Sequence, residues 1–239
     1  MELLSQLLVL SGVTLMAGLA MPLGALIARI GRGGWQPSAE FSHTIMAFGG
    51  GALLSAVALV LVPEGSASLS MPVAATCLVL GGLVFMLIDI GLSRSATPAD
   101  QMLAMLLDFV PESLALGAAF ALGSQSAYLI AALIALQNIP EGYNAFRELS
   151  EASGYGARRI LLMFSLMAFL GPLAAMGGYF WFSDHDQALG IIVLVAAGGI
   201  LYSVFQDIAP KVPLARHWSP PMGAVLGFML GMAGDMLVH

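Results

Sequence analysis

The feature that most constrains this chain is a succession of long apolar stretches separated by short polar segments. A helix needs roughly 20 apolar residues to cross a bilayer, and Gly, Pro and polar breaks divide the sequence into stretches of about that length. There are eight, at residues 3–30, 40–62, 70–93, 99–123, 126–147, 158–182, 188–208 and 219–237. Only 9% of the residues are charged, whereas a soluble domain carries roughly 25%. The sequence therefore predicts an all-α polytopic membrane protein with eight transmembrane helices.

The basic residues fall only in the first, third, fifth and seventh connections between these stretches. They are Arg29, Arg32, Arg94, Arg147, Arg158, Arg159, Lys211 and Arg216. Cytoplasmic loops carry an excess of Lys and Arg, so both termini are predicted to lie outside. We expect a multi-pass protein of the cell (plasma or inner) membrane. Its surroundings are the lipid bilayer, and no basic tract suggests nucleic acid as a partner.

Short sequence similarities relate the two ends of the chain. The matching pairs are "LMAGLAMPLGA" (15–25) with "LMAFLGPLAA" (166–175), "GGALLSAVALVLVP" (50–63) with "GGILYSVFQDIAP" (198–210), and "DFVPES" (108–113) with "QNIPEG" (137–142). They predict a single transmembrane domain in a 3+2+3 inverted repeat, an arrangement common in transporters. Its parts are residues 1–93, 99–151 and 158–239. The alternative is that Gly-, Ala- and Leu-rich stretches resemble one another by composition alone.

The central pair of stretches carries polar residues at mid-membrane depth. Asp108 and Glu112 are four residues apart, as are Gln137 and Glu141, so each pair shares one helix face. The proline inside each motif cannot donate a backbone hydrogen bond and leaves the carbonyl four residues earlier without its helical partner. Each motif thus offers two side-chain oxygen ligands and one backbone oxygen.

Three of these side chains are acids, namely Asp108, Glu112 and Glu141. A carboxylate at the bilayer centre costs about 2.5–3.5 kcal/mol, hence roughly 7–10 kcal/mol for three. All basic residues lie at the ends of the stretches, so the compensation must come from protons, water or a bound cation. Oxygen ligands favour Mg²⁺, Mn²⁺, Ca²⁺ or Fe²⁺, whereas zinc usually recruits His or Cys. The motifs predict an intramembrane site for a divalent cation.

At these residues the chain resembles the ZIP (Zrt/Irt-like) family of divalent-metal transporters. "QNIPEG" (137–142) matches a motif of that family letter for letter, and "AGLAMPLGAL" and "FGGGALLSAVALVLVPEG" read like its first two spans. The resemblance implies a primary metal site formed by Asp108, Glu112, Gln137 and Glu141. It implies a second, adjacent site that includes Asn138. The cargo would be Zn²⁺, Fe²⁺, Mn²⁺ or Cd²⁺, with no organic cofactor, and a homodimer is one arrangement that the resemblance allows.

The chain also departs from the family pattern. Asp108 replaces the family's fourth-span His, Phe109 replaces the neighbouring Asn, and Gly171 replaces the acid before the sixth-span proline. Of the second site only Asn138 remains, so we expect one metal rather than a bridged pair. Near the seventh stretch, Gln206 and Asp207 either line an exit path or cap a helix end.

The sequence thus predicts a secondary transporter, not driven by ATP, that moves divalent metal cations toward the cytoplasm. The alternative is a non-transporting metal sensor or structural membrane protein that retains the transporter fold. An enzyme is not expected, because the chain has no HExxH or GxSxG motif and "GMAGD" (231–235) does not match an intramembrane aspartyl protease.

Overall fold

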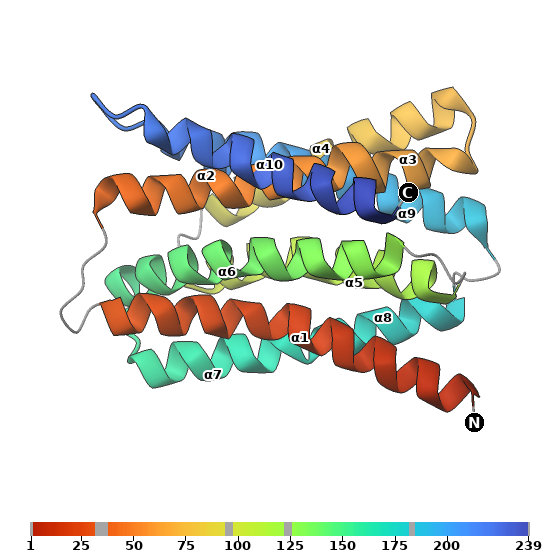
Figure 1. Ribbon diagram of the computed structural model, residues 1–239, viewed down its shortest axis with the longest axis horizontal. Helices are drawn as coiled ribbons and strands as arrows, with labels where there is room; N and C mark the ends of the chain where they lie inside the picture. The colour runs from red at the N-terminus through yellow and green to blue at the C-terminus, as the bar shows by residue number, and fades with distance from the viewer. Residues whose placement is uncertain (1, 32–37, 94–97, 122–125, 182–184, 239) are drawn as a thin grey trace.

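The computed structural model describes residues 2–31, 38–93, 98–121, 126–181 and 185–238, and these form a bundle of eight roughly parallel and antiparallel helical rods (Figure 1). The elements are α1 (Glu2–Gly31), α2 (Ala39–Ser55), the π-helix η1 (Ala56–Leu61), α3 (Val62–Ala67), α4 (Met71–Ser93), α5 (Pro98–Ala121), α6 (Ser126–Ala152), α7 (Ala157–Ala168), α8 (Leu170–Trp181), α9 (Asp186–Ser203), the π-helix η2 (Val204–Ile208), the 3₁₀-helix η3 (Ala209–Lys211) and α10 (Ser219–Val238). The second rod is α2–η1–α3, the sixth α7–α8 and the seventh α9–η2–η3. The prediction of an all-helical protein is confirmed.

Five of the rods are long and apolar enough to cross a membrane: α1, α2–η1–α3, α4, α7–α8 and α9–η2–η3. Over the residues that the structure describes, α5, α6 and α10 are not in that group. Two of them, α5 and α6, carry the polar motifs, and the other rods shield them from the surroundings. The polar motifs of these two helices therefore lie in the interior of the bundle.

Several rods extend beyond the stretches that the sequence predicts. The second continues to Ala67 rather than residue 62, and the helical rod passes through Pro63 directly after the π-helical turn η1. The fifth continues to Ala152 rather than residue 147, since a helix can carry charged residues once it leaves the apolar layer. Hydropathy marks where the apolar zone ends, and the helix need not end there.

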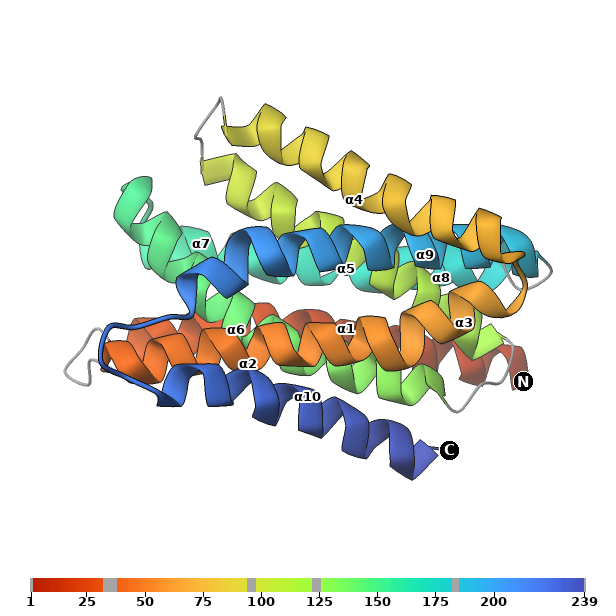
Figure 2. The same ribbon diagram turned by 90° about the horizontal axis from the view of Figure 1, so that it is seen from above.

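The rods pack as two groups around the central pair. In one group α1 lies against α6, α7 and α8, and α5 lies against α8. In the other, α2 lies against α10, and α4 against α9. Figure 1 shows α5 and α6 between the lower helices α1, α7 and α8 and the upper helices α2, α4, α9 and α10, and Figure 2 shows the same bundle from above. The polar motifs therefore lie where the two groups meet.

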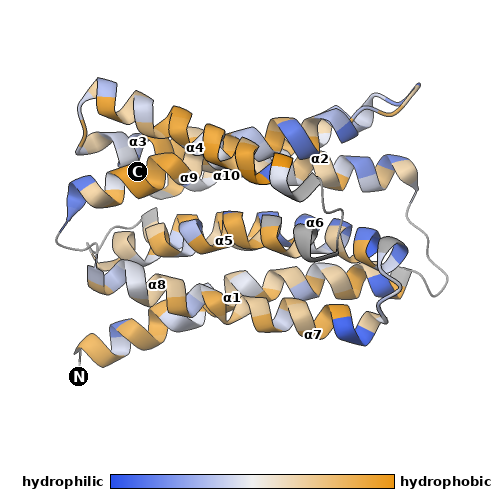
Figure 3. Cartoon of the chain, turned by 180° about the vertical axis from the view of Figure 1, so that it is seen from behind, coloured by the Kyte–Doolittle hydropathy of each residue, from blue (hydrophilic) through white to orange (hydrophobic). Residues whose placement is uncertain are grey.

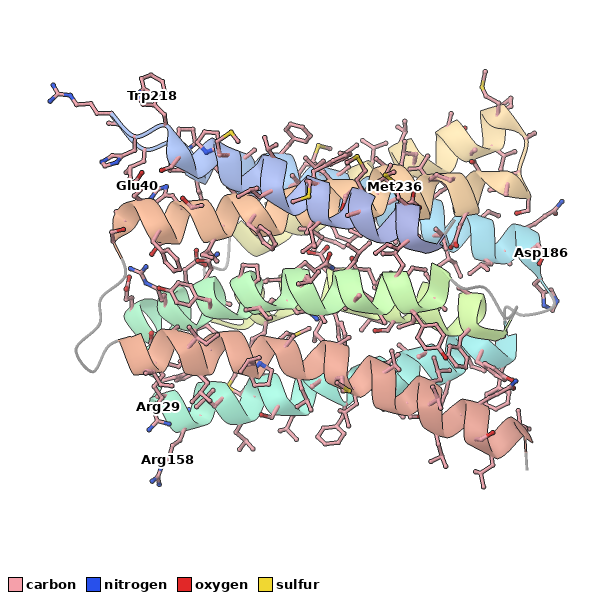
Figure 4. The ribbon with its side chains drawn as sticks, viewed as in Figure 1. Arg29, Glu40, Arg158, Asp186, Trp218 and Met236 are labelled. Atoms are coloured by element: carbon pink, nitrogen blue, oxygen red, sulfur yellow. The ribbon has the colours of Figure 1, made fainter. Side chains whose placement is uncertain are left out.

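The two ends of the bundle differ in charge. Arg29 and Arg158 lie at one end, which we call the basic end, and Asp186 lies at the opposite, acidic end (Figure 4). Helix α1 begins and α10 ends at the acidic end (Figure 1). Arg32 and Arg94 lie outside the described residues. The separation follows the alternation of basic residues in the sequence.

Hydrophobic residues predominate along the helices between these ends (Figure 3). Large side chains such as Leu8, Leu162 and Leu173 are exposed, far more than a soluble monomer of this size tolerates. The backbone beneath them is satisfied by helical hydrogen bonds, as a lipid environment requires. The surface thus fits a membrane protein.

Glycines bring α1 and α6 into backbone contact beside the motifs. A Cβ atom on Gly24 would lie 2.0 Å from the Ile139 carbonyl oxygen, and one on Gly142 would lie 2.1 Å from the Met21 oxygen. Gly117 and Gly178 bring α5 and α8 together in the same way. Small residues at helix–helix contacts are typical of membrane bundles. These contacts fix the position of the motif helices.

Candidate metal centre

The structure brings the predicted site residues to the middle of α5 and α6, which run without a break through Pro111 and Pro140. Glu112, Gln137 and Asn138 are buried, with exposed fractions of 2%, 3% and 1%. Asp108 and Glu141 are half-buried. The direction of the two helices places Glu112 and Gln137 nearer the acidic end, and Asp108 and Glu141 nearer the basic end. We call the buried pair Glu112 and Gln137 the sealed level of the site, and the half-buried pair Asp108 and Glu141 its accessible level.

A hydrogen-bonded pair joins the two motifs at the sealed level. The Gln137 Nε2 atom lies 2.6 Å from both Glu112 Oε1 and Glu112 Oε2 and donates to them. The amide oxygen of the same side chain, Gln137 Oε1, is buried without a hydrogen-bond partner in the described part of the chain. Hydrogen bonds to charged groups contribute about 1.5–3 kcal/mol, whereas an unpartnered buried acceptor costs about 1–3 kcal/mol. Part of the stabilisation from this pair is therefore offset by the orphaned oxygen.

The three acids are close enough for their charges to act on one another. Asp108 interacts electrostatically with both Glu112 and Glu141, and Glu112 also acts on Glu141. Asp108 Oδ1 is a second buried atom without a hydrogen-bond partner in the described residues. The ion pairs found between described residues, Lys211–Glu148 and His217–Glu40, lie elsewhere. The centre is thus a concentration of negative charge with unused oxygen ligands.

Asn138 points away from this pair. Its Nδ2 atom donates to the Ala17 carbonyl oxygen of α1 at 2.9 Å. An asparagine that binds a backbone carbonyl 121 positions earlier in the chain ties α6 to α1. In this structure Asn138 therefore contributes to packing, and its amide oxygen is the only part left for a ligand.

Phe109 fills the space between α5, α1 and α8, in the position next to Asp108. Its side chain is 1% exposed. A Cβ atom on Gly171 would lie 2.6 Å from Phe109 Cζ, and one on Gly18 would lie 2.9 Å from the same atom. Both glycines thus leave room for the ring. The sequence identified Phe109 and Gly171 as departures from a motif, but gave no sign that they pack against each other.

A cavity of about 10 Å³ adjoins the Glu112–Gln137 pair. Besides these two side chains, it is lined by apolar residues from η1 and α6: Ala56, Val60, Leu61, Ile130, Leu133 and Ile134. A single water molecule needs a cavity of about 10–15 Å³. The cavity is therefore just large enough for one water molecule or one small ion, and apart from Glu112 and Gln137 its wall is apolar. π-Helical turns such as η1 are frequent at functional sites.

At the accessible level, Asp108 interacts electrostatically with Asp207 on η2. Asp207 is exposed and in turn interacts with Asp89, Glu148 and Lys211. Asp89 accepts a hydrogen bond from the Tyr202 hydroxyl at 2.9 Å. Acidic groups therefore continue from Asp108 toward the basic end, whereas apolar side chains lie beyond Glu112.

The side chains as they lie do not form a complete set of ligands around one metal ion. The described residues contain no group of three or more His, Cys, Asp and Glu side chains placed to hold one ion. The donors that remain are carboxylate and amide oxygens, which suit hard divalent cations. The orphaned oxygens of Asp108 and Gln137 fit such a ligand set. Coordination of one ion by all three acids would require side chains to turn.

No protein-family model matches the chain, and no curated protein matches it either. The fold and the surface define the class: an all-helical protein with several helices able to span a membrane. The site at its centre adds a buried set of interacting carboxylates and amides.

Proposed function

We propose that this chain is a secondary transporter of divalent metal cations and a divergent member of the ZIP family. One ion would bind per site, held by Asp108, Glu112, Gln137 and Glu141, with Asn138 beside them. The observation that carries the proposal is the group of three mutually repelling carboxylates in the interior of an apolar bundle. Such charge is costly in a membrane and typically marks an ion pathway.

The packing of the rods supports the proposed 3+2+3 inverted repeat. In such a repeat α1 corresponds to the rod α7–α8, and α6 corresponds to α5. The contact between α1 and α6 then corresponds to the contact between α8 and α5. In the same way, α2 corresponds to α9 and α10 corresponds to α4, so the contact between α2 and α10 corresponds to the contact between α9 and α4. The π-helices η1 and η2 follow Ser55 and Ser203, which occupy matching positions in the two similar segments.

The burial of the site supports a release path toward the basic end, which we assign to the cytoplasm because basic residues gather there. On this assignment both termini lie outside. Glu112 and Gln137 face an apolar wall, whereas Asp108 and Glu141 are half-buried and Asp207 is exposed. We assign Asp207 to the exit path. Alternating access would require the two groups of rods to move against each other around α5 and α6.

The proposal is tested by uptake of Mn²⁺, Fe²⁺, Zn²⁺ and Cd²⁺ into proteoliposomes that contain the purified protein. We expect uptake above that of protein-free liposomes for at least one of these ions. Metal binding without uptake of any ion would instead support a sensor or structural protein that retains the fold. The orphaned oxygens of Asp108 and Gln137 are compatible with binding in either case.

Uptake is expected to fall as the pH is lowered from about 8 to about 5, because protons and metal ions compete for the same carboxylate oxygens. The initial rate should be measured at a fixed free metal concentration. Uptake mediated by a metal ionophore in the same liposomes serves as a control for the metal gradient. A rate that stays constant across this range would contradict carboxylate ligation.

Replacing Asp108 with histidine is expected to shift the preference toward zinc, because imidazole nitrogen is a usual zinc ligand. We expect the ratio of Zn²⁺ to Mn²⁺ uptake to rise about tenfold, equivalent to about 1.4 kcal/mol. The matched control, Asp108→Asn, removes the charge but retains an oxygen ligand and should not raise the ratio. Equal ratios in the wild type and Asp108→His would place Asp108 outside the selectivity-determining ligands.

A further inference from the structure

The Gln137 amide occupies the position on Glu112 that a bound cation would take. Its Nε2 atom lies at the same distance, 2.6 Å, from both carboxylate oxygens. Ca²⁺ bound to both oxygens of a carboxylate lies about 2.3–2.6 Å from each. The NH₂ group carries partial positive charge on its hydrogens. The NH₂ group therefore occupies the place of an ion between the two carboxylate oxygens, but without a net charge.

The same side chain carries the ligand that an ion would need. Gln137 Oε1 is buried and has no hydrogen-bond partner in the described residues. The oxygen and nitrogen of a glutamine amide have nearly the same shape, so a half-turn about the last side-chain bond exchanges their positions with little change in packing. After that turn, Oε1 would face the two oxygens of Glu112. The side chain would also have to draw back from Glu112 by rotation about its other bonds, so that a cation could take the former position of Nε2 between the three oxygens.

We propose that Gln137 is an amide latch that alternates between these two orientations during transport. This inference rests on the proposed function. With no cation on Glu112, the NH₂ group donates to the carboxylate and compensates its charge. With a cation bound, the amide turns and Oε1 becomes a ligand. The two states exclude each other, because the cation and the NH₂ group claim the same position.

The latch has a consequence for the transport cycle. A carrier must return without its cargo, and a carboxylate deprived of its cation is then buried in an apolar bundle. The Gln137 donor lowers that cost, so it should promote the return step. Net uptake includes this return, whereas exchange of one metal ion for another across the membrane does not. The latch therefore predicts that the two kinds of transport can be separated.

The Gln137→Glu variant tests this separation when transport is measured at high pH, because an ionised carboxylate keeps an oxygen ligand and has no hydrogen to donate. We expect net Cd²⁺ uptake to fall at least about tenfold while exchange of external Cd²⁺ for internal Cd²⁺ is largely retained. The control Gln187→Glu adds the same charge to an exposed position at the start of α9. If net uptake and exchange change by the same factor, Gln137 is a ligand only and the latch is overturned.

A second measurement follows the wild-type protein itself and uses a variant only to assign one signal. Protein labelled with ¹⁵N-glutamine would be followed by NMR, and the Gln137 NH₂ signal would be identified by its absence in Gln137→Met. We expect slow exchange of these hydrogens with solvent in metal-free protein, and a large change of the signal at saturating Cd²⁺. If Cd²⁺ binds by calorimetry and the signal is unchanged, the latch is overturned and the proposed function is not. If none of Mn²⁺, Fe²⁺, Zn²⁺ and Cd²⁺ binds, both are overturned.

Discussion

The double variant Glu112→Ala/Glu141→Ala is expected to abolish metal uptake. It removes one carboxylate from the sealed level and one from the accessible level, leaving Asp108 as the only acid of the motif pair. Interactions with charged groups contribute about 1.5–3 kcal/mol each, so two lost ligands correspond to a reduction of at least about 100-fold. Initial rates of Mn²⁺ and Cd²⁺ uptake into proteoliposomes measure the effect.

The same variant is expected to fold. Removing carboxylates from an apolar bundle relieves a cost of about 2.5–3.5 kcal/mol each, whereas the freed Gln137 NH₂ group costs about 1–3 kcal/mol. The midpoint of thermal unfolding in detergent should therefore stay near that of the wild type or rise. The control Glu151→Ala removes an exposed glutamate from α6, the helix that also carries Glu141, and should leave uptake unchanged. A double variant that misfolds would assign the acids a structural role, and one that transports normally would refute the site.

Replacing Gly24 with leucine is expected to separate α1 from α6 and destabilise the bundle. The added Cβ alone would lie 2.0 Å from the Ile139 carbonyl oxygen, which belongs to the backbone and cannot turn aside. Overpacking typically costs about 1–3 kcal/mol, and we expect about 3 kcal/mol or more because two backbones must move. Thermal unfolding and the fraction of protein that elutes as a single species from a sizing column measure the loss.

Gly12→Leu on the same helix is the matched control, because no neighbouring atom lies within 4 Å of a Cβ atom there. It should leave both measurements nearly unchanged. The Gly24 variant should also lower uptake in whatever protein still folds, since Ile139 lies between Gln137 and Glu141 in the motif. Equal stability of the two variants would mean that the α1–α6 contact is looser than the structure shows.

The sequence alone determined the parts of this protein that depend on local composition. It predicted helices at eight places, and the rods lie there, with ends that differ by a few residues where charged or proline-containing turns continue the helix. It also predicted that Glu112 and Gln137 belong to one polar centre. Both results follow from periodicity and hydropathy, because a side chain four residues along a helix lies on the same face and an acid avoids lipid.

Only the tertiary structure decided how the side chains of the centre are used. Asn138 shares its motif with Gln137, yet it bonds to Ala17 of α1 while Gln137 bonds to Glu112 of α5. Phe109 occupies a space that exists because Gly18 and Gly171 carry no side chain there. These outcomes depend on contacts between helices that are distant in the chain, and no local pattern encodes which neighbour a buried side chain will meet. Composition thus set the elements and the polarity of the centre, whereas packing set its geometry.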